Sequence, residues 1–250
     1  GTTLTAAGVA VDAAVRSVSL AAGVGTLTVR GPVRALLYTS GDEIVSNPSP
    51  GAPLPRGTVP DTASAPVAEL LAQYGLTVSS GEHLDDTPVA FREALGTPGT
   101  DLVVVIGATG HGVADHLRAA LTDAGAQILI DGLAVRPGGS LLVAQLPSGA
   151  VLLGLGGNPL AAVAGTAVLV PAIVDALLAR TPRTIELLDV VDGDEARLPG
   201  RWRVLPAEPD GAGRWSVTRG RGTGHLASTI GYRALVLVPP RELTGAYQRL

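Results

Sequence analysis

The sequence contains no cysteine, no methionine and no lysine, and aromatic residues make up only 3% of its 250 residues. The lack of cysteine excludes disulfides, zinc sites built on thiolates and cysteine nucleophiles. All 18 basic residues are arginine, which excludes a Schiff-base lysine and the lysine of a phosphate-binding P-loop. Because aromatics are scarce, the core must be built from alanine, valine and leucine. The hydrophobic content of 46% is enough for a sizeable one.

An excess of positive charge is also lacking. The formal net charge is −4 at pH 7, and charged residues make up 16% of the chain. We therefore expect no nucleic-acid partner, since such binding depends on neutralising phosphates. The start of the chain has no basic stretch ahead of an apolar one, so we see no secretory signal and expect a cytoplasmic protein. Because the chain begins at Gly1 and contains no methionine, we expect it to be part of a longer translation product.

Long apolar runs are scarce, and the longest candidate is P-L-A-A-V-A-G-T-A-V-L-V-P-A-I-V at residues 159–174. A membrane span needs roughly 18–20 apolar residues, and Asp175 ends this run. We therefore predict a buried core helix and no membrane partner.

Apolar runs typical of strands alternate with segments of helical periodicity in the middle of the chain, residues 31–182. The expected strands are 33–40, 76–84, 101–106, 126–131, 140–146 and 150–156, and the expected helices are 61–75, 87–96, 114–125 and 159–179. Such alternation predicts an α/β fold with a mainly parallel sheet covered by helices on both faces.

The two ends of the chain have different patterns. Residues 183–250 contain short strand-like runs separated by turns, which predicts a small C-terminal β domain. Within it, we expect residues 192–200 to form a solvated turn. Residues 1–30 contain a helix-like stretch at about 9–22 and a predicted strand, G-T-L-T-V-R, at 25–30. We interpret residues 1–30 as the remnant of a preceding domain.

Three polar or glycine-rich segments follow predicted strands: T-S-G-D-E at 39–43, G-A-T-G-H-G at 107–112 and G-L-G-G-N-P at 154–159. The carboxyl ends of parallel strands meet at one edge of a sheet, where ligands bind. Asn158 suits a helix cap and Pro159 a first helical position. The glycines leave backbone amides uncovered, so an anion could reach the helix N-terminus. An ordinary capped turn explains the same residues equally well.

Carboxylates gather near the same strand ends. Hard oxygen ligands of this kind suit Mg²⁺ together with a phosphate-bearing ligand. Taken singly, each acid is better explained by helix capping or solvation. His83 and His116 lack the spacing of metal ligands, and we expect them to be structural or exposed. The acids are Asp42, Glu43, Asp85, Asp86 and Asp115.

Taken in order, these segments resemble the molybdopterin molybdenumtransferase family, which includes MoeA and the E domain of gephyrin. T-S-G-D-E-I resembles the family's S-T-G-D-E-L, and L-D-D-T-P-V-A-F-R-E-A-L resembles its D-D-x-x-x-L-x-x-A-L stretch. V-R-P-G-G-S resembles K-P-G-K-P, and G-L-G-G-N-P-L-A-A resembles G-L-P-G-N-P-V-S-A. I-G-A-T-G-H-G-V-A-D lies where the family has S-G-G-V-S-x-G-x-x-D. The resemblance implies a three-layer α/β/α molybdopterin-binding domain followed by a small β domain.

The resemblance also implies a reaction and the residues that carry it. In the family, adenylylated molybdopterin meets molybdate and Mg²⁺, the adenylate is released, and molybdenum enters the dithiolene. The matching catalytic acids are Asp42, Glu43, Asp86 and Asp115, of which Glu43, Asp86 and Asp115 would hold Mg²⁺. The matching ligand-binding residues are Thr39, Ser40, Gly41, Gly107, Thr109, Gly110, Arg136, Gly138, Gly157, Asn158 and Pro159. Family members form homo-oligomers, so we expect a dimer or trimer.

Several positions depart from the family pattern and keep other functions open. Both serines of S-G-G-V-S are lost, the asparagine of the D-S-N segment is Ala63, and one of two lysines becomes Gly139. These losses favour a non-catalytic molybdopterin-binding or scaffold relative as an alternative. The G-A-T-G sequence suggests a second alternative, an activity like that of molybdopterin adenylyltransferases.

Overall fold

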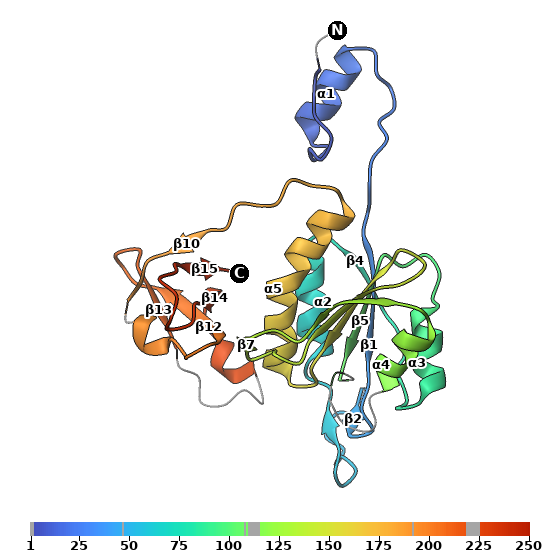
Figure 1. Ribbon diagram of the computed structural model, residues 1–250, viewed down its shortest axis with the longest axis vertical. Coiled ribbons are helices and arrows are strands. Elements are labelled where there is room, and N and C mark those ends of the chain that lie inside the picture. The colour runs from blue at the N-terminus through green and yellow to red at the C-terminus, as the bar shows by residue number, and fades with distance from the viewer. Residues whose placement is uncertain (1–2, 47, 108, 110–115, 192, 219–225) are drawn as a thin grey trace.

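The computed structural model of the chain describes residues 3–46, 48–107, 109, 116–191, 193–218 and 226–250. It consists of an α/β domain, a C-terminal barrel-like β domain and an N-terminal arm, residues 3–32, that extends away from both (Figure 1). The predicted fold class is confirmed.

The α/β domain is built on a six-stranded sheet in the order β4-β1-β5-β9-β8-β6. Only β8 runs against its neighbours, because β9 and β6 both pair with it antiparallel. In the central register, Leu37 pairs with Val104, which pairs with Leu153. The strands are β1 (Arg34–Thr39), β4 (Thr77–Ser80), β5 (Leu102–Ile106), β6 (Gln127–Asp131), β8 (Leu142–Gln145) and β9 (Val151–Leu155).

Helices cover both faces of this sheet, as the sequence predicts. On one face, α2 (Ser64–Gln73) and α5 (Pro159–Leu177) bury an aliphatic core that includes Val67 and Val170. On the other face, α3 (Pro88–Leu95) and α4 (His116–Asp123) pack around Phe91, which is fully buried. The prediction of a core helix is confirmed for α5, because 61% of its apolar stretch is buried inside the protein.

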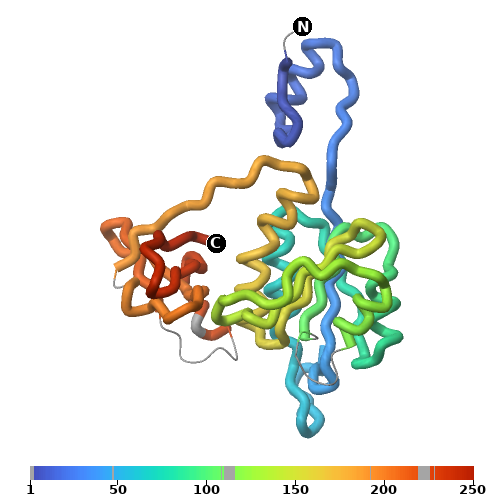
Figure 2. The backbone as a smooth tube through the Cα atoms, viewed as in Figure 1, coloured from blue at the N-terminus to red at the C-terminus, as the bar shows by residue number. Residues whose placement is uncertain are grey.

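The β domain forms a second sheet in the order β10-β15-β14-β12-β13-β11. Its strands are β10 (Leu187–Leu188), β11 (Val190–Val191), β12 (Trp202–Pro209), β13 (Trp215–Val217), β14 (Ala234–Val238) and β15 (Tyr247–Arg249), with 3₁₀ turns at η1 (Gly193–Ala196) and η2 (Leu226–Thr229). The segment between α5 and β10 crosses from one domain to the other (Figure 2).

The two domains share a strand pairing and a core. The short strand β7 (Val135–Arg136) leaves the α/β domain and pairs parallel with β12, so that Val135 lies opposite Trp202. Val135, Ala164 of α5 and Val204 of β12 form a buried cluster at this junction. Because both domains bury apolar surface here, we expect them to stabilise one another.

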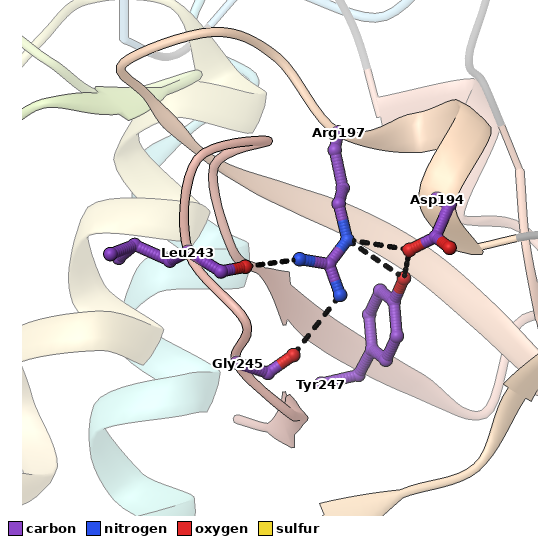
Figure 3. Close-up of polar contacts among 5 residues, drawn as sticks. All are labelled: Asp194, Arg197, Leu243, Gly245 and Tyr247. Atoms are coloured by element: carbon purple, nitrogen blue, oxygen red, sulfur yellow. Dashed lines mark hydrogen bonds and ion pairs between the residues drawn. The ribbon is translucent and has the colours of Figure 1, made fainter.

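The expectation of a solvated turn at 192–200 holds for only part of its described residues, because Asp194, Glu195, Pro199 and Gly200 are exposed and the others are not. Ala196 is fully buried, and the side chain of Arg197 is only 12% exposed. Arg197 donates to the carbonyl oxygens of Leu243 at 2.6 Å and Gly245 at 3.1 Å (Figure 3). This guanidinium therefore ties the turn to the loop before β15.

An aromatic ring completes the contacts of Arg197. Tyr247 lies under the guanidinium, 5.1 Å from ring centroid to Cζ, and its hydroxyl accepts from Nε at 3.1 Å (Figure 3). The same hydroxyl donates to Asp194 at 3.1 Å. Burial raises the pKa of Tyr247 above its ordinary value, so the ring stays neutral and the cluster serves to hold the domain together.

The N-terminal arm contains α1 (Ala13–Ala21), capped by Asp12, whose carboxylate accepts from the N–H of Val15 at 2.8 Å. The predicted helix is therefore present. The predicted strand at 25–30 is absent from the described arm, and its apolar side chains Leu27 and Val29 are exposed. The physical reason is the lack of a neighbouring strand to accept its hydrogen bonds.

A small two-stranded ribbon, β2 (Ile44–Val45) and β3 (Val59–Pro60), brackets the proline-rich loop beside the sheet edge.

Candidate ligand-binding site

A cavity of about 420 Å³ lies at the carboxyl ends of β1, β5 and β9. The first predicted segment contributes Thr39, Ser40 and Glu43 to its wall. The other two contribute Gly107, Gly157, Asn158 and Pro159. Three stretches far apart in the sequence therefore meet at one site, as expected for the edge of a parallel sheet.

Close backbone contact between the turns explains the glycine at position 107. Gly107 has φ of +114°, and a Cβ atom there would overlap the carbonyl oxygen of Ser40. A Cβ on Gly157 would lie 3.5 Å from the Cα of Gly107, which is an ordinary van der Waals contact. At these two glycines the cavity wall carries no side chain, which lets a ligand approach the backbone closely.

Helix α5 begins at the cavity wall. The Oδ1 of Asn158 accepts from the N–H of Ala161 at 3.1 Å, and Pro159 occupies the first helical position. The capping that the sequence predicts is present. The helix has 19 residues, so its N-terminus carries a partial positive charge that favours an anion in the cavity.

Among the predicted acids that the structure describes, Glu43 is the one that lines the cavity. Gly41 makes room for it, because a Cβ on Gly41 would lie 2.9 Å from Oε2 of Glu43. Asp42 is exposed and lies outside the cavity wall. Both acids are therefore exposed, but Glu43 lines the cavity and Asp42 does not.

Asp86 makes a different contact. Its carboxylate lies 3.9 Å from Nε2 of His116, and it is not part of the cavity wall. Asp85 is exposed. Among the residues that the structure describes, no three His, Cys, Asp or Glu side chains are grouped to hold a metal ion. Asp115 and Gly110 fall outside the described residues, so the predicted trio of Glu43, Asp86 and Asp115 stays a prediction.

Three further predicted residues do not line the cavity. Thr109 is 1% exposed, and its hydroxyl lies 3.5 Å from that of Ser140. Gly138 supports the first turns of α5, because a Cβ there would lie 3.1 Å from the carbonyl oxygen of Ala161. Arg136 is exposed on β7.

Sequence reasoning missed two polar residues beside the cavity. Asp61 lies in its wall and accepts from the N–H groups of Ala63 at 2.9 Å and Ser64 at 3.0 Å. Its place just before a helical run could have identified it. His83 reaches Thr39, with 2.9 Å between Nδ1 and Oγ1. No sequence spacing could have paired them, because 44 residues separate the two.

Comparison with known proteins identifies the family. The family model described as a probable molybdopterin binding domain matches residues 37–175, more than half of the chain. The protein therefore belongs to this family, and the predicted resemblance is confirmed.

Curated relatives are molybdopterin molybdenumtransferases of cyanobacteria. The protein from Synechococcus elongatus is 32% identical over 143 residues, which cover 56% of this chain and 35% of that protein. The protein from Nostoc is 30% identical over 165 residues, which cover 64% of this chain and 37% of that protein. The chain thus spans little more than a third of the relatives it matches.

Solved structures support the fold. A molybdopterin biosynthesis MoeA protein from Pyrococcus horikoshii has a TM-score of 0.70 at 16% identity and covers 100% of this chain and 60% of its own. A molybdenum cofactor biosynthesis protein from Pyrococcus furiosus has a TM-score of 0.67 at 16% identity and covers 100% of this chain and 80% of its own. Both the α/β domain and the barrel-like β domain are therefore MoeA-like in fold.

Proposed function

We propose that the chain acts in molybdenum cofactor biosynthesis, binding adenylylated molybdopterin and inserting molybdate with release of AMP. The observation that carries the proposal is the meeting of Glu43, the bare backbone of Gly107 and the N-terminus of α5 in one cavity. Family membership supports molybdopterin as the ligand class.

Each part of the cavity has a role in this proposal. The N-terminus of α5 would bind a phosphate oxygen through uncovered N–H groups. The absence of a side chain at Gly107 and Gly157 would let that group sit against the backbone. The hydroxyl of Thr39 would donate to a second phosphate oxygen. These contacts orient the ligand so that its reacting bond lies near Glu43.

The donor chemistry of the wall fits Mg²⁺, which prefers one or two carboxylates together with substrate phosphates. Glu43 is the described carboxylate that we assign to this role, and Asp61 is a second carboxylate in the same wall, because only its Oδ1 accepts the two backbone N–H groups. Asp86 and Asp115 are proposed as its further ligands from the family pattern. When bound, Mg²⁺ would neutralise charge developing on the phosphate.

A single assay tests the proposal. The purified chain is incubated with adenylylated molybdopterin, molybdate and Mg²⁺, and AMP release is followed. We expect release that depends on molybdate. Binding without release would instead favour a non-catalytic molybdopterin-binding relative, and formation of the adenylylated ligand from ATP would favour an adenylyltransferase.

Glu43→Gln sharpens the assay. Because Glu43 is exposed and lines the cavity, we expect the variant to fold normally and to lose AMP release by about a hundredfold or more. Glu93→Gln, on α3 across the sheet, is the matched control and should behave as the unmodified chain. Full activity in Glu43→Gln would remove Glu43 from the mechanism.

The proposal extends to assembly and location. We propose that the chain works in the cytoplasm as a homo-oligomer, a dimer or a trimer. The apolar side chains exposed on the N-terminal arm support association.

A further inference from the structure

The side chain of His83 is held beside the cavity by main-chain pairing. Two backbone hydrogen bonds bracket it: Gly81 N–H donates to Leu37 at 2.8 Å, and Leu84 N–H donates to Thr39 at 2.8 Å. His83 therefore follows β4 along the end of β1, and its Nδ1 lies 2.9 Å from the hydroxyl oxygen of Thr39. The imidazole is half-buried and lies behind Thr39, which itself lines the cavity.

The direction of this hydrogen bond decides what Thr39 can offer a ligand. A hydroxyl carries one proton and two lone pairs. If Nδ1 accepts, the Thr39 proton points at His83 and the cavity sees only lone pairs. If Nδ1 carries the proton, it donates to Thr39, and the Thr39 proton is free to point into the cavity. Phosphate oxygens of an esterified ligand accept hydrogen bonds, so only the second arrangement attracts them.

We propose that His83 is a positioning residue of this site: its Nδ1–H donates to Thr39 and thereby directs the Thr39 hydroxyl proton at an anionic oxygen of the ligand. This inference rests on the proposed function for the identity of the ligand as a phosphate ester. The two side chains then act as one unit, in which His83 contributes to binding only through Thr39.

The experiment measures the affinity of the full chain for adenylylated molybdopterin without molybdate, by equilibrium dialysis. His83→Leu removes the donor. His83→Asn places an amide where Nδ1 stood, so a donor is restored at the same position. Thr39→Val removes the hydroxyl. The double variant, which combines His83→Leu with Thr39→Val, completes a double-mutant cycle. Thr97→Val is the control, because it removes a hydroxyl bonded to Tyr38 on the opposite side of β1 at 3.1 Å.

We expect Thr39→Val to weaken binding about tenfold, the size of one hydrogen bond to a charged group. We expect His83→Leu to weaken binding by a smaller factor, because the Thr39 hydroxyl keeps its proton and loses only the group that directs it. The double variant should be no weaker than Thr39→Val, since His83 acts only through the Thr39 hydroxyl. His83→Asn should recover most of the affinity, and Thr97→Val should match the unmodified chain. In ¹⁵N spectra of the unmodified chain, Nδ1 of His83 should be protonated once the ligand is bound.

Three results would overturn the inference while leaving the proposed function in place. They are multiplicative losses in the double variant, affinity in His83→Leu equal to that of the unmodified chain, and an unprotonated Nδ1 in the complex. Failure of the unmodified chain to bind adenylylated molybdopterin at all would overturn the proposed function, and this inference with it. Melting temperatures of all variants separate a loss of fold from a loss of binding.

Discussion

Gly107 packs so tightly against Ser40 that no side chain fits between them. Gly107→Ala should destabilise the protein by about 2–5 kcal/mol, the sum of a positive φ and an overpacked contact. Urea unfolding measures the loss. The turn that carries Gly107 forms part of the cavity wall, so ligand binding should fall with it.

Gly125 provides the matched comparison for that substitution. It also has positive φ, +68°, but a Cβ there would meet nothing within 4 Å. Gly125→Ala should cost only the conformational part, about 1–2 kcal/mol. Equal losses of unfolding free energy in the two variants would show that contact with Ser40 adds no cost to a side chain at position 107.

A second prediction at the residue scale concerns pH. Asp175 of α5 has a side chain only 10% exposed, and Arg183 binds it through two hydrogen bonds, of 2.9 and 3.0 Å. These bonds hold the pKa of Asp175 below its ordinary value of 3.8. The pair therefore stabilises the fold fully above pH 3.8, and this contribution is lost as pH falls through the lowered pKa.

Arg183→Gln should cost about 1–3 kcal/mol at neutral pH, because it leaves a buried carboxylate with weaker partners. The difference in unfolding free energy between this variant and the unmodified chain should become smaller below pH 3.8, as Asp175 becomes protonated. Unfolding by urea at several pH values measures it. Arg214→Gln, which breaks an exposed pair with Asp210, should change stability by less than about 1 kcal/mol. If the loss of stability in Arg183→Gln stays constant with pH, the pair of Asp175 and Arg183 is not the source of this pH dependence.

At the scale of the element, the N-terminus of α5 combines capping with anion attraction. Asn158→Asp keeps a capping oxygen, since Asp and Asn cap about equally well, but it adds a negative charge at the cavity wall. Asn158→Ala removes the cap without adding charge. The two variants therefore separate stability from binding.

We expect Asn158→Asp to unfold like the unmodified chain and to bind adenylylated molybdopterin at least tenfold more weakly. Asn158→Ala should lose about 1 kcal/mol of stability and less binding than Asn158→Asp. Thermal unfolding and equilibrium dialysis measure the two quantities. Stronger binding in Asn158→Asp than in Asn158→Ala would argue against an anion at this helix end.

At the scale of the whole molecule, the N-terminal arm exposes apolar side chains far from either core (Figure 1). Val18 and Leu20 of α1 are 46% and 67% exposed, and Ser19 is the buried residue of this helix. Exposed apolar surface of this kind favours association. Sedimentation equilibrium should therefore report an oligomer.

The double variant Val18→Asp and Leu20→Asp should shift that equilibrium towards the monomer. Ile230→Asp, at a position 79% exposed on the β domain, is the matched control and should leave the mass unchanged. An unchanged mass in the double variant would show that the arm does not hold the oligomer together.

Much of this protein's structure can be predicted from local features of its sequence. The strand and helix pattern between 33 and 179 follows from periodicity, which depends only on neighbouring residues. The cap at Asn158 follows from a motif of a few residues. The meeting of Thr39, Gly107 and Gly157 could be predicted as well, because parallel strands place their carboxyl ends together.

Features that depend on contacts between residues remote in the chain were determined only by the tertiary structure. The reversal of β8, the crossing of β7 into the second sheet and the burial of Arg197 each arise from partners remote in the chain. The same holds at the site, where Glu43 faces the cavity while Asp86 turns to His116. Composition and motif thus determined the fold class and the ligand class to expect. Which side chains share the cavity was decided only by folding, because strand order and packing bring together residues with no signal in their spacing.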